Sequence, residues 1–227
     1  MRKTRRASSP PVPAELGFGE HAYALLGSRI EEALKLARSR GRRVVAAITV
    51  SLPGSIDPIA HVEAARQLKD PWSAFAQPAR GDFTLATLDA VAGVITEGPE
   101  RFEQVAASCG QALEAALIDD LFDDPGAPAG SGIVWVGGFS FLDAHPAADI
   151  WREFPGATFA LPPFSIARSG ASGQARLTIA AAIEPDSVTA DELALVEQGV
   201  ERLQLETDLG AQRFAPRPGP TTVASVQ

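Results

Sequence analysis

Hydrophobic positions along the chain repeat first with helical and then with strand spacing. Residues 20–39 carry apolar side chains every three or four positions, as expected for one buried face of a helix. These positions are Leu26, Ile30, Leu34 and Ala37. Residues 43–54, RVVAAITVSLPG, are instead rich in β-branched side chains and stop at a Pro-Gly pair, which predicts a strand. Asp57 and Pro58 then form a typical helix start, and we expect a short helix that runs to Asp70.

The middle of the chain predicts two strands followed by a helix. Residues 72–78 predict a short strand, ARGD supplies a turn, and residues 83–98 predict one longer strand. Both faces of the longer strand are mostly apolar, so we expect it to be covered on both sides. Pro99 opens a helix over residues 99–121 with one apolar stripe. The stripe consists of Phe102, Val105, Cys109, Leu113, Ala116 and Leu117.

Three further strand-like segments follow an acidic, glycine-rich loop at residues 123–132. Residues 132–141, GIVWVGGFSF, are apolar and aromatic around two adjacent glycines. We interpret them as a strand in which Gly137 and Gly138 permit another element to approach closely. The segments FPGATFALPPFSIARSG and QARLTIAAAI predict a strand pair joined around residues 170–173.

A final helix and the order of the elements define the fold class. Thr189 and Glu192 form a capping box that opens a helix over residues 189–203, with Leu193, Val196, Val200 and Leu203 facing inward. Several strands follow one another without an intervening helix, so the sequence predicts an α+β fold with a largely antiparallel or mixed sheet. We expect the helices over 99–121 and 189–203 to cover one face of that sheet.

Composition separates the two ends from the folded body. Residues 1–14 are basic and then Ser/Pro-rich, which predicts a disordered tail, and residues 215–227 resemble a linker. Residues 15–214 then form the folded unit. The chain has a formal net charge of −8, which argues against a nucleic-acid partner. No apolar run is long enough to span a membrane and no signal peptide is visible, so we expect a cytoplasmic protein.

Two motifs could carry chemistry, but neither has the context that its chemistry needs. Ser140 lacks the final glycine of a G-x-S-x-G nucleophile turn, although Asp143 and His145 lie nearby in sequence. The adjacent glycines before it, with no helix after them, do not form a dinucleotide loop. Residues 119–124, DDLFDD, match the DDxxD pattern that holds magnesium and diphosphate in prenyl-transferring enzymes. Those enzymes are helical and need a second acidic motif, so we expect Asp119, Asp120, Asp123 and Asp124 to form a solvated loop at a helix end.

The remaining titratable residues indicate no site. The histidines, His21, His61 and His145, are not spaced as zinc ligands. The lysines, Lys3, Lys35 and Lys69, are not placed as a desolvated catalytic base. The single cysteine, Cys109, allows no internal disulfide and is expected to be a small buried hydrophobe. From the residues alone we assign no catalytic residue, no cofactor-binding residue and no metal ligand.

Three segments taken together resemble the N-terminal half of isochorismate synthases. They are residues 70–106, residues 135–143 (WVGGFSFLD) and residues 151–179, which contain the FP…LP…AR pattern. Their order and spacing are similar to those in the chorismate-utilising superfamily, which includes anthranilate synthase component I and aminodeoxychorismate synthase. The likeness covers residues 42–203.

The resemblance implies one half of an anthranilate synthase component I-like α/β sandwich. In that family a lysine, a glutamic acid and Mg²⁺ act on chorismate in the C-terminal half, and no position here matches those residues. We therefore expect a scaffold half that is inactive alone, binds no Mg²⁺ itself and has the chorismate-binding half as its partner. The pathway, for menaquinone or for siderophores and salicylate, stays open, as do the oligomeric state and whether the chain is truncated or naturally short.

Two alternatives also stay open. The first is a fragment of anthranilate or aminodeoxychorismate synthase, although the LLES-type motif that marks a tryptophan site there is absent from this sequence. The second is a stand-alone, non-enzymatic domain whose apolar sheet face binds a partner. Both this domain and the scaffold half would expose apolar side chains for association.

Overall fold

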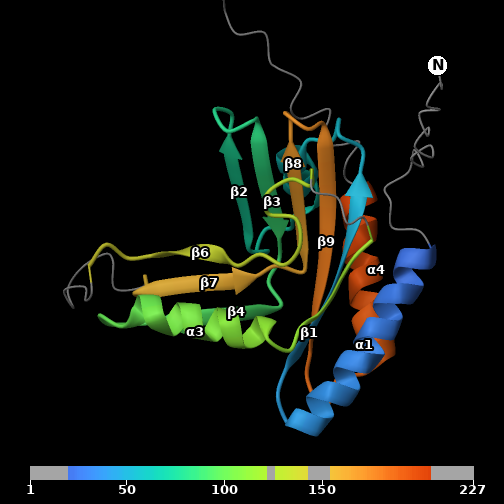
Figure 1. Cartoon of the computed structure of the whole chain (residues 1–227), viewed down its shortest axis with the longest axis vertical. Helices are drawn as coiled ribbons and strands as arrows, with labels where there is room; N and C mark the ends of the chain where they lie inside the picture. The colour runs from blue at the N-terminus through green and yellow to red at the C-terminus, as the bar shows by residue number, and fades with distance from the viewer. Residues whose placement is uncertain (1–19, 122–125, 143–153, 206–227) are drawn as a thin grey trace, which may run out of the picture.

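The computed structural model describes residues 20–121, 126–142 and 154–205, and these residues form the predicted α+β fold (Figure 1). The helices are α1 (Glu20–Arg40), α2 (Pro58–Ala65), α3 (Arg101–Leu113) and α4 (Thr189–Leu205). The strands are β1 (Val44–Leu52), β2 (Trp72–Gln77), β3 (Phe83–Leu88), β4 (Ala92–Thr96), β5 (Leu117–Asp120), β6 (Val136–Phe139), β7 (Ala157–Leu161), β8 (Phe164–Ser169) and β9 (Gln174–Ile183). The predicted tail and linker, residues 1–14 and 215–227, lie outside the described residues.

The larger sheet has six strands in the order β2-β3-β8-β9-β1-β5. Its neighbouring strands are antiparallel except for β1 and β5, which run parallel. β8 and β9 form the predicted pair joined around residues 170–173, with Ile166 opposite Leu177. The prediction of a mixed, largely antiparallel sheet is therefore confirmed.

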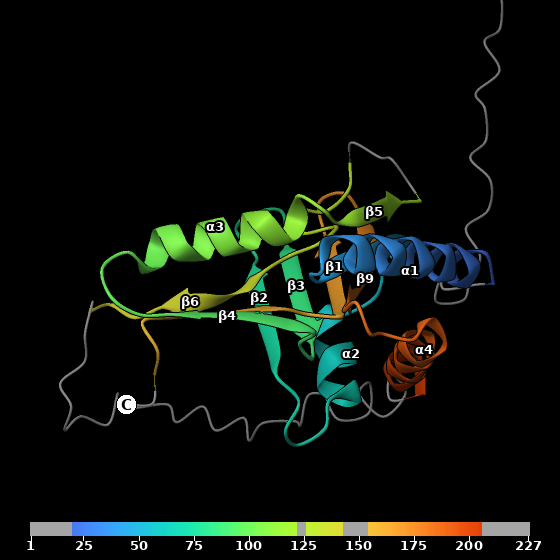
Figure 2. The ribbon, with the colours of Figure 1, turned by 90° about the horizontal axis from the view of Figure 1, so that it is seen from below.

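Helices α1, α2 and α4 cover one face of the six-stranded sheet. Alternate side chains of β1 and β9 face these helices, and Ile48 lies directly opposite Ile179 at the centre of this core. The predicted apolar positions of α1 are all buried here, and Val196, Val200 and Leu203 of α4 join them. Figures 1 and 2 show α1 and α4 on the same side of β1 and β9. Helical and strand spacing together thus identified this core from the sequence.

The start of α2 follows the predicted capping chemistry. The Asp57 side chain accepts hydrogen bonds from the backbone N–H groups of Ile59 and Ala60 at 3.0 and 3.2 Å. The helix nevertheless ends at Ala65, so the expected extension to Asp70 is wrong. The carboxylate of Asp70 instead accepts the backbone N–H of Gln67 and pairs with Arg202 of α4, which fixes the connection outside the helix.

The predicted strand over residues 83–98 is in fact two strands in two different sheets. β3 ends at Leu88, and Asp89 then takes a left-handed conformation with φ of 66°. β4 continues in a new direction and pairs with β7, while β3 pairs with β8. The pairing of Leu88 with Phe164 and of Ala92 with Leu161 places the bend beside Pro162 and Pro163, which lack the N–H groups that a continuous ladder would need. Apolar alternation continues across the bend, so the sequence pattern could not reveal it.

The smaller sheet has three strands in the order β4-β7-β6 and extends sideways from the larger one (Figure 1). The predicted strand in residues 132–141 is present as β6. A Cβ atom added to Gly137 would lie 2.1 Å from the Thr158 carbonyl oxygen of β7 and 2.6 Å from the Cα of Phe159. The expectation of close backbone approach is therefore confirmed at Gly137, whereas a Cβ at Gly138 would meet open space.

The helix predicted over residues 99–121 ends early. α3 stops at Leu113, and residues 117–120 form β5, which extends the six-stranded sheet beside β1. Pairing with β1 overrides the helical spacing of this segment. Only Val105 and Arg101 of α3 are buried, and Phe102 and Leu113 of the predicted stripe are exposed. The stripe therefore predicted the buried face only in part.

The expectation that α3 and the final helix cover the same sheet face is also wrong. α4 packs with α1 and α2 against the first face of the six-stranded sheet. α3 packs against β4 and β7 of the smaller sheet and touches β1 (Figure 2). In the described residues, no helix has the length and hydropathy needed to cross a membrane.

Candidate functional site

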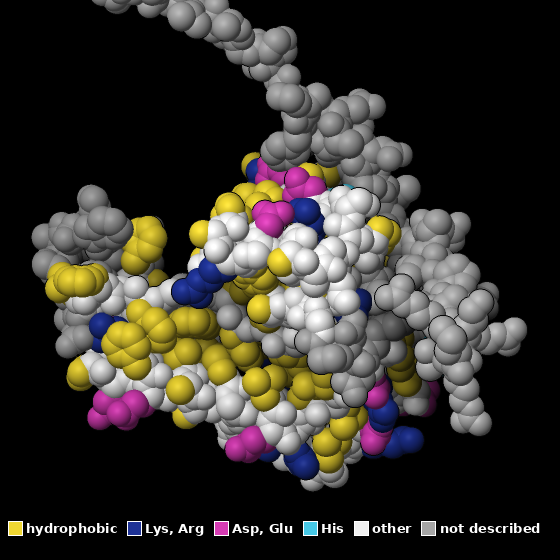
Figure 3. All heavy atoms as spheres, turned by 45° about the horizontal axis from the view of Figure 1, so that its top comes forward, with side chains coloured by type: hydrophobic (Ala, Val, Ile, Leu, Met, Phe, Trp, Pro, Cys, Tyr) yellow, Lys and Arg dark blue, Asp and Glu magenta, His cyan; other side chains and the backbone are white. Residues whose placement is uncertain are grey.

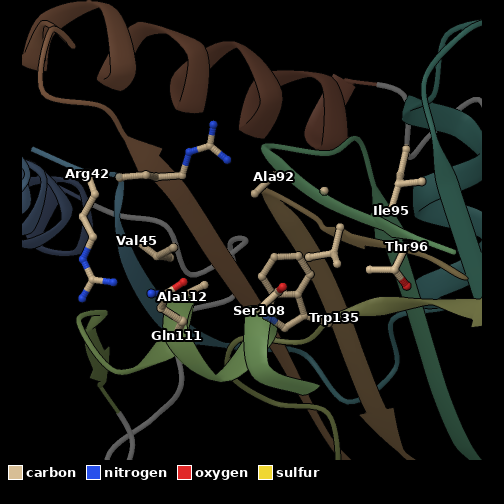
Figure 4. Close-up of a pocket in the computed structure, with 12 residues that line it drawn as sticks. Arg42, Val45, Ala92, Ile95, Thr96, Ser108, Gln111, Ala112 and Trp135 are labelled. Carbon is tan, nitrogen blue, oxygen red and sulfur yellow. The ribbon is translucent and has the colours of Figure 1, made fainter. Parts of the chain in front are cut away.

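A cavity of about 430 Å³ lies between α3, β4 and the start of β1 (Figure 4). In the view of Figure 4, Arg42, Val45 and Gln111 lie towards one end of the cavity, and Thr96 lies towards the other. Trp135 lies between these ends. The cavity therefore has a polar end, which carries a positive charge, and an aromatic wall.

The outer edge of β4 forms one side of this cavity. Five consecutive residues, 92–96, line it, although successive side chains of a strand point to opposite faces. The lining must therefore include the backbone edge of the strand rather than one face of side chains. Among the described strands only β7 pairs with β4, so this edge leaves alternate N–H and C=O groups available to a ligand.

Two adjacent arginines supply the positive charge at the polar end. Arg43 pairs with Glu184, through an Nε–Oε1 contact of 2.5 Å, whereas no acidic side chain of the described residues pairs with Arg42. Sequence reasoning missed this pair. The only signal was two arginines directly before the β1 segment, which also fits a solvated turn.

The remaining walls combine aromatic and polar groups. Ser108, Gln111 and Ala112 come from α3, and Trp135 comes from the segment that enters β6. The indole nitrogen of Trp135 is buried and has no hydrogen-bond partner within the part of the chain that the structure describes. The cavity thus offers hydroxyl, amide and guanidinium donors beside an aromatic ring.

The second face of the six-stranded sheet carries a row of polar side chains that crosses every strand. In order across the sheet they are Asp120, Thr49, Thr178, Ser165, Thr87 and Ser73. Oγ1 atoms of Thr49 and Thr178 lie 3.1 Å apart, and Ser73 Oγ lies 2.8 Å from Thr87 Oγ1. The N–H of Gly132 donates to Thr178 at 2.9 Å, so the segment before β6 is anchored to this row. These bonds satisfy buried hydroxyls and give the row a structural role.

The smaller sheet presents a cluster of aromatic rings, and part of it is exposed. The rings of Phe102 and Phe139 stack at 4.3 Å between centroids, and Phe139 meets Phe159 at 4.9 Å. Phe139 is 39% exposed, and Phe141, two residues later in the chain, is 99% exposed. Figure 3 shows hydrophobic side chains in a band that runs from the part of the molecule formed by the smaller sheet towards the part formed by the larger sheet. We call Phe102, Phe139, Phe141 and Leu142 the aromatic surface.

Arg101 holds the two elements of the aromatic surface together. Its side chain is buried and donates to the carbonyls of Gly98 at 3.0 Å and Ser140 at 3.3 Å. Its guanidinium also lies 4.6 Å from the Phe102 ring centroid. The start of α3 and the end of β6 are therefore fixed relative to each other.

Ser140 forms hydrogen bonds with backbone groups at the end of β6. Its N–H donates to the Gly156 carbonyl at 2.8 Å, and its hydroxyl donates to the Leu142 carbonyl at 2.5 Å. It follows an exposed strand end rather than a sharp strand-to-helix turn, which the nucleophile motif requires. Asp143 and His145 lie outside the described residues.

Asp119 is not at the end of a helix, and its side chain is half-buried rather than fully solvated. It lies on β5, where its side chain accepts hydrogen bonds from Arg29 of α1, one of them at 3.1 Å from Nη2. This carboxylate raises the pKa of Arg29 above its usual range, chiefly through the side-chain hydrogen bond. Asp120 points to the opposite sheet face, so the two do not form one site; Asp123 and Asp124 lie outside the described residues.

The other titratable candidates lie apart from one another. His21, Lys35 and Lys69 are exposed, as expected of solvated positions, and Nδ1 of His61 lies 2.8 Å from the carbonyl of Asp57. Cys109 is only half-buried, and its partial burial raises the pKa of its thiol. In residues 20–121, 126–142 and 154–205 no three histidine, cysteine or acidic side chains come together as a metal site.

The family of the chain follows from its sequence. The sequence profile of a family described as "Chorismate binding enzyme" matches residues 30–220. A comparison with curated proteins found no match. A solved structure, that of MenF, the menaquinone-specific isochorismate synthase from Escherichia coli, is similar with 15% sequence identity and a TM-score of 0.43. The match covers 77% of this chain but only 34% of that one, so the chain spans about a third of that enzyme. On the family match, which covers most of its length, this chain belongs to the chorismate-binding enzymes.

Proposed function

We propose that this chain is the N-terminal scaffold half of an isochorismate synthase, which converts chorismate to isochorismate for a menaquinone or siderophore/salicylate pathway. Membership of the chorismate-binding family supports the substrate class. The order of the segments at residues 70–106, 135–143 and 151–179 supports the isochorismate branch of that family. In this proposal Mg²⁺ and the residues that act on chorismate belong to a separate chorismate-binding half.

The observation that carries the proposal is the aromatic surface on the smaller sheet. An exposed aromatic group with fixed geometry is typical of a surface that another protein element covers. Arg101 keeps Phe102 and Phe139 in one arrangement, so the surface is preorganised. Preorganisation lowers the entropy lost on docking, which favours tight association with a partner half.

The net negative charge of the chain is consistent with substrate binding by the other half. Chorismate is a dicarboxylate, and a net charge of −8 gives little electrostatic attraction to it. In the complete enzyme Mg²⁺ would offset the substrate carboxylates and act as a Lewis acid. The residues described here would instead position the partner half through the two sheets.

Chorismate turnover in the presence of Mg²⁺ tests this function. The chain alone should form no isochorismate, and addition of a separately expressed chorismate-binding half of an isochorismate synthase should give turnover. Phe139→Ser should weaken that complementation, whereas Leu195→Ser, at an exposed position on α4, should not. Isochorismate formed by the chain alone would overturn the scaffold role.

A stand-alone partner-binding domain is the second candidate, and the same aromatic surface favours it. It predicts that the surface associates with another protein while no chorismate-binding half complements the chain. The complementation assay therefore separates the two candidates. A pull-down with wild-type chain and with Phe139→Ser would then show whether the aromatic surface carries the association.

A further inference from the structure

We propose that the cavity between α3, β4 and Arg42 binds a small organic acid. Its carboxylate would lie at the arginine end, and a flat ring or similar apolar body would lie against Trp135. This inference concerns ligand binding by the chain itself, and it does not depend on the scaffold role.

Charge identifies the acid group of the ligand. Arg42 and Arg43 both line the cavity, and only Arg43 has an acidic partner among the described residues. A guanidinium binds a carboxylate through two parallel N–H···O bonds, which gives both strength and orientation. Because Glu184 already pairs with Arg43, Arg42 is the cation that would receive the ligand carboxylate.

Size and lining identify the body of the ligand. A volume of about 430 Å³ lies within the range of about 300–1,000 Å³ that is usual for small-molecule sites. Trp135 offers an aromatic wall, and Val45 and Ala112 offer apolar contacts towards the charged end. Ser108, Gln111 and the open edge of β4 can hydrogen-bond polar substituents. Together these groups favour a ring carboxylate with few substituents.

Benzoate and benzamide form a matched pair of probes, since they share a shape and differ in charge. Binding can be followed by the indole N–H signals in NMR spectra of the ¹⁵N-labelled chain, which has three tryptophans. Trp135→Phe assigns the relevant signal. We expect benzoate to shift the Trp135 signal saturably and benzamide to bind at least about tenfold more weakly, because it cannot form the charge-assisted pair.

Two variants test the site by independent means. Arg42→Gln removes the charge and should weaken benzoate about tenfold or more, equivalent to about 1.4 kcal/mol. Ala112→Leu keeps the charge, suits the helix and fills the cavity, so it should also weaken binding. Arg40→Gln is the matched control, because Arg40 is exposed at the end of α1 and does not line the cavity.

The proposal is overturned if benzoate produces no saturable shift, or if benzamide binds equally well. It is also overturned if Arg40→Gln weakens benzoate as much as Arg42→Gln, since that would indicate a non-specific charge effect. If both Arg42→Gln and Ala112→Leu fail to fold, the comparison of benzoate with benzamide on the wild-type chain still decides the question. A negative result here leaves the complementation test of the scaffold role unaffected.

Discussion

The two sheets of this molecule differ in how completely they are covered. The six-stranded sheet buries one face under α1, α2 and α4, with Ile48 and Ile179 fully buried at its centre. The three-stranded sheet has α3 on it, yet it keeps exposed phenylalanines and an open edge at β4. Burial of apolar area stabilises a fold, whereas exposed aromatic groups add little to the stability of the free chain. The larger sheet therefore maintains the fold, and the smaller one presents the surfaces available for binding.

The largest expected effect is the loss of core packing in the larger sheet. Ile179→Ala should lower the free energy of unfolding by about 2–5 kcal/mol, because it leaves a cavity in a fully buried core. Phe139→Ala removes a larger side chain from the smaller sheet but should cost only about 1 kcal/mol, since Phe139 is part-exposed. Urea unfolding of both variants measures the difference. Equal losses would show that the two sheets do not divide their roles in this way.

An intermediate effect is expected where β6 meets β7. Gly137→Ala should cost about 1–3 kcal/mol and displace β6, because the new Cβ would overlap the backbone of Thr158 and Phe159. Gly138→Ala is the matched control: the same atom added one residue later meets open space and should change stability by less than about 0.5 kcal/mol. Thermal unfolding and the amide spectrum of β7 check both. If the two alanines behave alike, the close approach of these strands is not real.

A smaller loss of stability is expected at acid pH, on the helix-covered side of the larger sheet. The Gln67 N–H, followed by Arg202, holds the pKa of Asp70 below its usual value. Because the pKa of Asp70 is lower in the folded chain than in the unfolded chain, the ionised carboxylate stabilises the fold. This stabilisation is complete above the pKa of Asp in the unfolded chain, about 3.9, and is lost as the pH falls through the pKa of Asp70 in the folded chain. The wild-type chain should therefore lose stability below about pH 4, and Asp70→Asn should lose less over the same window. Identical acid dependence of the two proteins in urea unfolding would contradict the role of Asp70.

The sequence predicted elements best where local chemistry and packing agree. Helix α1, strand β1 and the Asp57 cap follow directly from spacing and from hydrogen-bonding side chains. The bend at Asp89 could not be predicted, because apolar residues continue on both sides of it and the change of sheet depends on pairing with β7 and β8. β5 was missed because its apolar residues also continue the helical stripe of α3.

The candidate site was largely beyond sequence reasoning. Its parts come from the start of β1, from β4, from α3 and from Trp135, and only the tertiary fold brings them together. Arg42 and Arg43 were visible as a pair, but nothing in their spacing distinguishes a ligand site from a solvated turn. Close approach at Gly137 was the exception, because a glycine inside an apolar strand often marks a bulge or a neighbouring backbone that leaves no room for a side chain.

Sedimentation velocity of the whole chain over a range of concentrations tests the central claim most directly. The account predicts concentration-dependent association, because the aromatic surface is exposed and preorganised for a partner. Phe102→Ser combined with Phe139→Ser should shift the chain to monomer, while Leu195→Ser on α4 should leave the association unchanged. A wild-type chain that stays monomeric at every concentration, or a double variant that associates as the wild type does, would contradict the claim that the smaller sheet is the docking surface.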